Sequence, residues 1–234
     1  NQLYQVTTVY AHAKKHNLKF DLNYNLEFGA MQGQHPKIYR NSFYKNFETT
    51  EVPFNIACRE PSFLHKPLPF LGIEHDVVYE GYYQSWKYFN SVDQDELNKF
   101  YHFGNNLSEK CDKGLTALKK KHNVDKIVGV HIRRGDYYRN PDIFNIVKKD
   151  YYDKAKEHFD KDTLFVYCTD DLNQVRKEFK FDEKNVLANG SSELEDLYVL
   201  SQCDSLIMGN SSFSAWGGYL GKKKEKIICP KNWF

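Results

Sequence analysis

The segment KIVGVHIRRGDY, residues 126–137, decides the fold of this 234-residue sequence. Its first seven residues form an almost continuous apolar run, which is typical of a strand buried on both faces of a parallel sheet. Similar runs recur further along the chain and alternate with segments of helical periodicity. We expect strands at 163–168, 186–187, 205–208 and 226–229, and helices at 151–159, 171–179, 192–203 and 212–221. This alternation predicts an α/β fold in which helices cover both faces of a parallel sheet.

The first half of the sequence is less regular. We expect a helix at 3–16, a strand at 18–22, loops with short elements at 23–71, a strand at 77–83, and a helix at 94–122 with a break at Gly104. The loop assignment rests on the turn-forming composition of that stretch, which holds five of the seven prolines. The change in regularity predicts two domains, 1–122 and 123–234.

Composition excludes several classes of protein. The 33 basic and 31 acidic residues nearly balance, so nothing attracts the whole surface to nucleic acid or to a membrane. The five cysteines form no C-x-x-C pair, which argues against a disulfide framework or a structural zinc and favours reduced thiols in a cytoplasmic protein. No apolar run is long enough to predict a membrane span. An anion site, if present, must therefore be local.

The first candidate site follows the strand at 126–132. Side chains alternate along a strand, so His131 and Arg133 are expected on one side of the chain. Gly135 allows a sharp turn, and Asp136 can hold Arg133 in place. A guanidinium fixed by a carboxylate suits a diphosphate. The alternative is an ordinary surface ion pair, and spacing alone does not decide between them.

Two further strand ends carry polar residues. Asp170 and Asp171 follow the strand at 163–168 and could accept hydrogen bonds from a nucleoside, although either could simply cap the next helix. The segment 209–214, GNSSFS, opens a helix whose N-terminus could hold an anion or could be a capping sequence without a ligand. An aspartate pair could also bind a metal, but no other residues cluster with it in the sequence. If the sheet is parallel, all three sites meet at one edge.

These motifs together resemble the α-1,2-fucosyltransferase family, glycosyltransferase family 11. HIRRGDY at 131–137 is similar to the H-x-R-x-G-D signature of that family. Other blocks of the family recur in order: NQLYQ at 1–5, EGYYQSWKYF at 80–89, YCTDD at 167–171, EDLYVLS at 195–201, GNSSFSAWG at 209–217 and PKNWF at 230–234. Only the stretch from about 23 to 75 is unmatched, and Ala215 stands where the family usually has Trp.

The resemblance implies an inverting, metal-independent enzyme that needs no cofactor, with a GT-B-type fold of two Rossmann-like halves facing across a cleft. The first half would be truncated, because the strand and glycines that precede Asn1 in the family are absent. Fucose would pass from GDP-fucose to a hydroxyl of a terminal galactose on a glycan acceptor.

The resemblance also implies roles for individual residues. The catalytic group would comprise Arg133 at the β-phosphate, His131 beside the nucleotide and Asp136 ordering the loop. Donor-binding residues would be Asp170 or Asp171 at the guanosine and Asn210, Ser211, Ser212 and Phe213 at the diphosphate, while Asn1 and Glu80 would face the fucose or acceptor. His131, Asp136 and Glu80 are all candidates for a general base.

Three alternatives remain open on sequence alone. The linkage could differ, as in α-1,6 or protein O-fucosylation, because such enzymes share the H-x-R core. The chain could be a non-catalytic glycan- or nucleotide-binding relative, or it could use another nucleotide sugar. The composition favours a microbial or viral cytoplasmic protein, with the Golgi lumen as the alternative if a targeting segment was removed.

Overall fold

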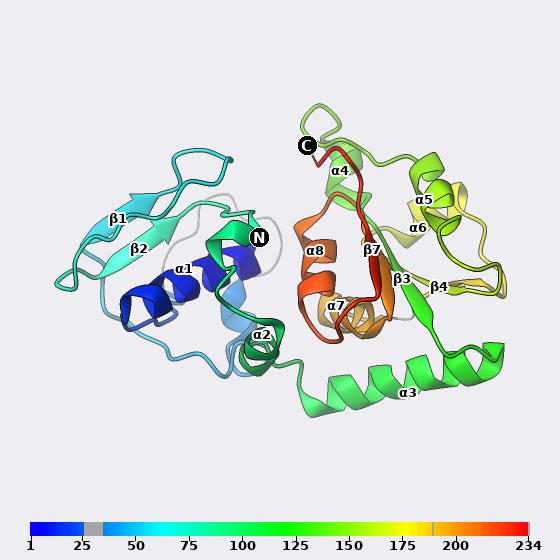
Figure 1. The fold of residues 1–234 in the computed structure, drawn as a ribbon, viewed down its shortest axis with the longest axis horizontal. Helices are drawn as coiled ribbons and strands as arrows, with labels where there is room; N and C mark the ends of the chain where they lie inside the picture. The colour runs from blue at the N-terminus through cyan, green and yellow to red at the C-terminus, as the bar shows by residue number, and fades with distance from the viewer. Residues whose placement is uncertain (26–34, 189, 234) are drawn as a thin grey trace. The chain divides into compact units, whose positions relative to one another are not determined.

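The computed structural model describes residues 1–25, 35–188 and 190–233, so Phe234 of the closing PKNWF block lies outside the described residues. The chain divides into two compact units, Asn1–His102 and Phe103–Phe234. Figure 1 shows the order of the elements along the chain. Each unit contains a parallel sheet.

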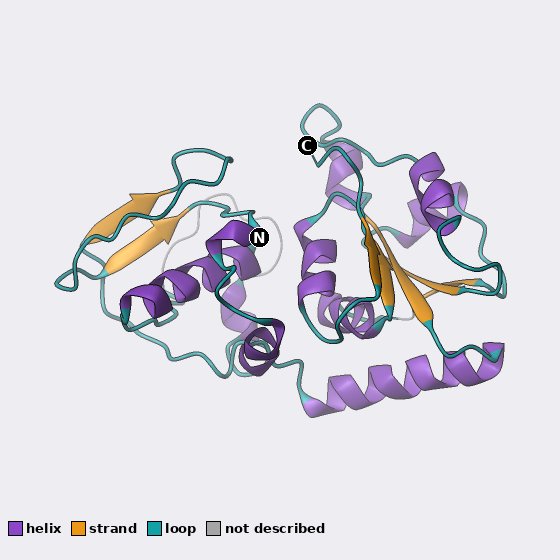
Figure 2. Cartoon of the chain, viewed as in Figure 1, coloured by secondary structure: helices purple, strands orange, loops and turns teal. Residues whose placement is uncertain are grey.

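The second unit is built on a five-stranded sheet (Figure 2). Its strands are β3 (Ile127–Ile132), β4 (Leu164–Thr169), β5 (Asn185–Leu187), β6 (Ser205–Ile207) and β7 (Lys226–Ile228). All neighbours are parallel, in the order β5-β4-β3-β6-β7. The chain therefore winds outward from β3 in one direction and then from β6 in the other. The switch in direction lies between β3 and β6, and ligands of such sheets bind at the carboxyl ends of the strands at this point.

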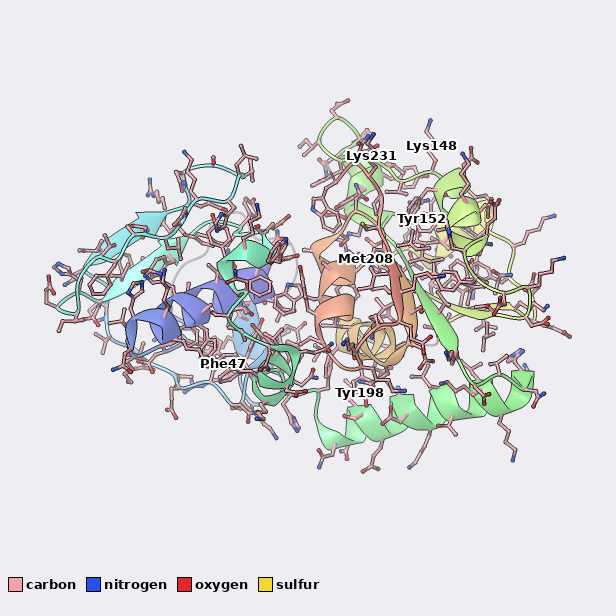
Figure 3. All side chains as sticks on the ribbon, in the orientation of Figure 1. Phe47, Lys148, Tyr152, Tyr198, Met208 and Lys231 are labelled. Carbon is pink, nitrogen blue, oxygen red and sulfur yellow. The ribbon has the colours of Figure 1, made fainter. Side chains whose placement is uncertain are left out.

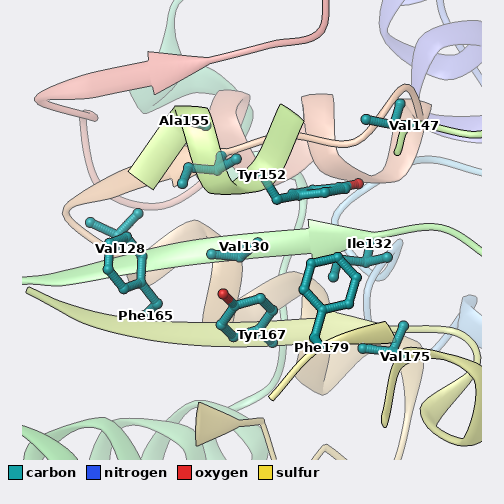
Figure 4. Close-up of a cluster of buried hydrophobic side chains, with 11 residues drawn as sticks. Val128, Val130, Ile132, Val147, Tyr152, Ala155, Phe165, Tyr167, Val175 and Phe179 are labelled. Atoms are coloured by element: carbon teal, nitrogen blue, oxygen red, sulfur yellow. The ribbon is translucent and has the colours of Figure 1, made fainter. Parts of the chain in front are cut away.

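Helices cover both faces of this sheet. They are α3 (Asn105–His122), α4 (Gly135–Arg139), α5 (Lys149–Lys156), α6 (Leu172–Glu178), α7 (Glu193–Gln202) and α8 (Ser212–Tyr219). Figure 4 shows Val130 of β3 in one core cluster with Tyr152 of α5. On the other face, a Cβ at Gly129 would lie 3.1 Å from Cδ2 of Leu200 in α7. The absence of a side chain at 129 thus lets α7 pack close to the central strand.

The first unit contains two α-helices, two 3-10 turns and a two-stranded sheet among its described residues. These elements are α1 (Gln2–His16), η1 (Pro36–Tyr39), β1 (Ile56–Arg59), β2 (Val77–Glu80), η2 (Trp86–Tyr88) and α2 (Gln94–Phe100). Phe47, labelled in Figure 3, packs against two other aromatic rings. Its ring centroid lies 5.1 Å from that of Phe100 and 5.5 Å from that of Tyr101. Aromatic packing of this kind supplies much of the apolar contact that holds the unit together.

The alternation predicted for 126–229 is confirmed, with each expected strand and helix present to within a few residues. The break at Gly104 is also confirmed, since α2 ends at Phe100 and α3 begins at Asn105. The strand expected at 18–22 is wrong: among the described residues, Leu22 makes only an isolated bridge, to Thr49. The helix α4 was not predicted, because only a turn was expected at Gly135.

The helix α3 lies between the predicted domain boundary, after His122, and the division seen in the structure, after His102. It packs against α7. Tyr198 donates its hydroxyl hydrogen to the carboxylate of Asp112 at 3.0 Å, and Lys110 Nζ donates to Glu195 Oε1 at 2.7 Å. These contacts attach α3 to the second unit.

Candidate functional site

The candidate site lies where β3, β4 and β6 end. Ile132 is the register partner of Thr169 across β3 and β4, and Val130 is the partner of Ile207 across β3 and β6. The three polar segments that follow these strands therefore leave the sheet at one edge, beside the switch point. The convergence that we expected for a parallel sheet is present.

Arg133 is held by two carboxylates. Its Nε lies 2.8 Å from Asp136 Oδ1, to which it donates, and 3.2 Å from Asp170 Oδ2. Burial lowers the pKa of Arg133, but the hydrogen bond to Asp136 and the negative charges of both aspartates outweigh it and raise that pKa. The side chain is 30% exposed, and within the described residues Nη1 and Nη2 donate no hydrogen bond. The outer edge of a fixed guanidinium is thus available to an anion.

Asp170 organises the turn as well as the guanidinium. Its Oδ1 accepts a hydrogen bond from the backbone N–H of Arg134 at 2.8 Å. A Cβ at Gly135 would collide with Oδ2 of the same carboxylate. Glycine at 135 is therefore required for Asp170 to reach both the backbone of Arg134 and the side chain of Arg133.

Arg134 is a site residue whose role sequence reasoning missed. Its side chain is only 1% exposed and is held by Glu178, with Nε donating to both carboxylate oxygens at 3.1 Å and Nη2 donating at 2.7 Å. Nη1 and Nη2 also donate to the carbonyl oxygens of Arg133 and Val147. A buried arginine needs such partners, but Glu178 is 44 positions away and no local pattern connects the two.

Asp171 caps α6. Its Oδ1 accepts a hydrogen bond from the N–H of Gln174 at 2.9 Å, which satisfies one of the free donors at the start of that helix. Both carboxylates of the Asp170-Asp171 pair thus make contacts within the protein. Asp171 therefore has the helix-capping role that the sequence offered as the alternative to nucleoside binding.

His131 is buried beside α8, with its ring centroid 5.1 Å from that of Phe213. Burial, and then the charge of Arg133, lower the pKa of His131 to about 3, so the imidazole is neutral near pH 7. Its Nδ1 has no hydrogen-bond partner within the part of the chain that the structure describes. A buried neutral imidazole has little capacity to accept a proton from a substrate, which weakens its candidacy as a general base.

Asn210 ties loops together at the end of β6. The side-chain Nδ2 of Asn210 donates to the backbone carbonyl oxygens of Asn145 at 2.6 Å and Trp233 at 3.1 Å. The backbone carbonyl oxygen of Asn210 accepts a hydrogen bond from the hydroxyl of Tyr137 at 2.7 Å. Ser211 then caps α8, accepting a hydrogen bond from the N–H of Phe213 at 3.3 Å. Ser212 is the first residue of the helix. The N-terminus of α8 is thereby fixed next to the loop that carries Arg133.

A second residue that sequence reasoning left unassigned is Asp196, in α7. Burial and the neighbouring charge of Glu195 raise its pKa to about 7. The thiol of Cys168, at the end of β4, donates to the backbone carbonyl of Asp196 at 3.8 Å. A Cβ at Gly190 would collide with the carboxylate of Asp196. A carboxyl group with a strongly raised pKa in a candidate site is a candidate for function.

Two predicted site residues belong to the first unit. Asn1 Oδ1 accepts a hydrogen bond from Gln84 Nε2 at 2.5 Å. Glu80 forms an ion pair in which Arg59 Nε lies 2.6 Å from its Oε2. Both predicted residues are thus held by neighbours within their own unit.

The described ranges, 1–25, 35–188 and 190–233, contain no group of three or more His, Cys, Asp and Glu side chains placed to hold a metal ion. No helix in them is both long and apolar enough to cross a membrane.

Comparison with known proteins identifies the relatives of the chain. A mouse protein named galactoside 2-alpha-L-fucosyltransferase Sec1 is 29% identical over 157 residues, which are 62% of this chain and 42% of the relative. An alpha-1,2-colitosyltransferase of Escherichia coli is 29% identical over 175 residues, 70% of this chain and 58% of the relative. The chain thus spans about half the length of the curated relatives it matches.

A solved structure resembles this chain in fold, and a family model matches its sequence. The NodZ alpha-1,6-fucosyltransferase of Bradyrhizobium, co-crystallized with GDP, superposes with a TM-score of 0.54 at 15% identity, covering 94% of this chain and 88% of that one. This similarity confirms the predicted GT-B-type α/β fold. The sequence matches the model of Glycosyl transferase family 11 over residues 72–234, which is most of its length. The chain therefore belongs to glycosyl transferase family 11.

Proposed function

We propose that this protein transfers fucose from GDP-fucose to a hydroxyl of a terminal galactose, forming an α-1,2 linkage with inversion. The observation that carries the proposal is Arg133, whose Nε is held by Asp136 and Asp170 while its terminal nitrogens donate to no other described residue. This group lies at the switch point of a doubly wound sheet, where such folds bind nucleotides. Membership of the family and a relative named as a galactoside fucosyltransferase support the choice of sugar and acceptor.

The diphosphate would lie between Arg133 and the N-terminus of α8. Ser211, Ser212 and Phe213 stand at that end of the helix, where the helix dipole favours an anion, and the N–H groups of Ser211 and Phe213 already donate to Gly209 O and Ser211 Oγ. Asn210 would act indirectly, because its amide holds two carbonyl groups. The GDP in the NodZ crystal supports a guanine nucleotide as the donor in this fold.

The guanine base would meet Asp196. We earlier expected Asp170 or Asp171 at the nucleoside, but both of these carboxylates are bonded within the protein. Asp196 is partly buried, and burial and the charge of Glu195 raise its pKa, so added hydrogen-bond donors would stabilise its ionised form. Guanine presents two adjacent N–H donors, which a carboxylate can accept together.

In the reaction, the acceptor oxygen would form a bond to C1 of fucose as the bond from C1 to the β-phosphate oxygen breaks. Arg133 and the N-terminus of α8 would stabilise the charge on departing GDP, and one such preorganised donor contributes roughly 3 kcal/mol. The hydroxyl proton would pass to solvent or to a phosphate oxygen. Among the candidate bases, His131 is neutral and buried, Asp136 is bonded to Arg133 and Glu80 is paired with Arg59, so leaving-group stabilisation carries the mechanism. Asn1 and Glu80 remain proposed for the acceptor side.

The test is Arg133→Ala, compared with Arg139→Ala as a matched control. Arg139 is exposed and lies six positions away in α4. With GDP-fucose and lactose, we expect the first variant to lose at least about 100-fold in kcat, as for removal of one oxyanion-hole donor, and the second to keep its activity. Full activity of a folded Arg133→Ala protein would reject the assignment.

The competing functions are separated by product and donor. An NMR determination of the product linkage distinguishes α-1,2 from α-1,6 transfer, and transfer to a serine or threonine peptide would indicate protein O-fucosylation. Because one relative is named a colitosyltransferase, GDP-colitose should be compared with GDP-fucose. A chain that binds GDP but transfers neither sugar would be a non-catalytic relative.

We also propose that the reaction needs no metal and takes place in the cytoplasm. Loss of activity in EDTA, restored by a divalent cation, would reject the first point. The second is supported by the cysteines, since none forms a disulfide and Cys58, Cys111, Cys168 and Cys203 are buried as free thiols. Fractionation of the source cells would test it.

A further inference from the structure

The two-stranded sheet of the first unit ends in a polar pair. The strands β1 and β2 are parallel, and their arrowheads point the same way in Figure 1. Their last residues, Arg59 and Glu80, are register partners and form an ion pair whose side chains are 80% and 44% exposed. Both charged groups can therefore reach a ligand at the carboxyl end of this sheet.

The loop that follows β2 is fixed by a neighbouring carboxylate. Glu60 Oε2 accepts hydrogen bonds from the backbone N–H groups of Tyr82 at 2.7 Å and Tyr83 at 3.0 Å. Tyr83 is fully buried and has a φ of 50°, an uncommon conformation for a residue with a side chain. The backbone is thus locked on both sides of the point from which Tyr82 extends.

Two exposed aromatic rings meet at this edge. Phe63 is 79% exposed and Tyr82 is 48% exposed, and their ring centroids are 5.8 Å apart with an interplanar angle of 33°. Phe63 follows β1, and Tyr82 follows β2, so both rings extend from the strand ends that carry the ion pair. By contrast Phe54, which is 45% exposed and precedes β1, makes no ring contact with another described residue.

We propose that Phe63 and Tyr82, together with Arg59 and Glu80, bind the galactose end of the acceptor. Galactose has an apolar C–H face, which packs on aromatic rings, and hydroxyl groups that bond to charged side chains. This edge offers both kinds of partner side by side, on a backbone that is already fixed. The inference rests on the proposed galactoside transfer, and it assigns the acceptor site to four named side chains.

The test uses the full chain with GDP present and methyl β-D-galactoside as the probe. Saturation-transfer NMR measures binding of the sugar to the wild type and to Phe63→Ala, Tyr82→Ala, Tyr82→Phe and the control Phe54→Ala. GDP affinity, measured by calorimetry, verifies that each variant is folded. We expect the two alanine variants at the edge to weaken sugar binding about tenfold each, as a stacking contribution near 1.4 kcal/mol implies. Tyr82→Phe keeps the ring and should bind like the wild type, and Phe54→Ala should do the same.

Unchanged sugar binding in Phe63→Ala and Tyr82→Ala would overturn the inference, as would absence of binding to the wild type or an equal loss in the Phe54→Ala control. The experiment does not depend on turnover. If the sugar binds as expected but no fucose is transferred, the transfer proposal fails and the binding site stands.

Discussion

Replacement of Asp196 by Asn should change how the stability of the protein depends on pH. The pKa of this carboxyl is raised from 3.8 to about 7, so between these values the folded protein holds a proton that the unfolded chain has released. The free energy of unfolding must then fall as pH rises through this window. Each pKa unit corresponds to 1.36 kcal/mol, which gives at most about 4 kcal/mol, and residual solvent screening reduces this to about 3 kcal/mol.

The titration of His131 changes the free energy of unfolding in the opposite direction, over an overlapping range of pH. Its pKa is lowered from 6.5 to about 3, so the unfolded chain binds a proton there that the folded protein does not, and stability is lost as pH falls through this window. In the wild type the two slopes partly cancel. In Asp196→Asn the opposing slope of Asp196 is absent, and His12, whose pKa is also lowered, acts in the same direction as His131, so stability should rise more steeply from pH 4 to 6.5 than in the wild type.

Urea unfolding followed by circular dichroism at pH values from 4 to 8 measures both effects. We expect Asp196→Asn to be more stable than the wild type by about 3 kcal/mol at pH 8 and nearly equal to it at pH 4. If the free energies of unfolding of the two proteins changed with pH in parallel over this range, the assigned pKa of Asp196 would be refuted. The GDP proposal adds a second readout, because donors from guanine should favour the ionised carboxylate and release a proton on binding near pH 6. Calorimetry in buffers of different ionisation enthalpy detects that proton.

Two other variants test the support of the site. Glu178→Gln leaves the buried Arg134 without its carboxylate and should lower the free energy of unfolding by about 3 kcal/mol, measured by urea denaturation, whereas the exposed Glu183→Gln should not. Gly135→Ala should displace Asp170 and reduce kcat at least about tenfold with little change in melting temperature. Wild-type turnover by the Gly135→Ala protein would show that the contact between Asp170 and Arg133 is dispensable.

Much of the second unit could be predicted from sequence because its signals are local. The strand at 127–132 is an almost continuous apolar run, and Asp171 and Ser192 stand directly before the helices that they cap. In the first unit β1 was hidden, since only one of its four residues, Cys58, is buried. A strand that is mostly exposed leaves little hydrophobic pattern to detect.

The site was predictable to a similar degree. The approach of Arg133 to Asp136 follows from a spacing of three residues, so the sequence predicts it. The contact of Arg133 with Asp170 and the burial of Arg134 against Glu178 depend on how the sheet brings distant segments together. The raised pKa of Asp196 likewise results mainly from burial, which cannot be predicted from the local amino-acid sequence.

The pairing of Arg134 with Glu178 also limits how this protein can be recombined with its relatives. One partner is in the loop after β3 and the other is at the end of α6, 44 positions later. A chimera that exchanged the HIRRGDY loop without α6, with a relative that lacks this pair, would leave a buried charge without its partner. Segments for loop grafting in this protein should therefore begin at β3 and extend through Glu178, so that both partners of the ion pair are exchanged together.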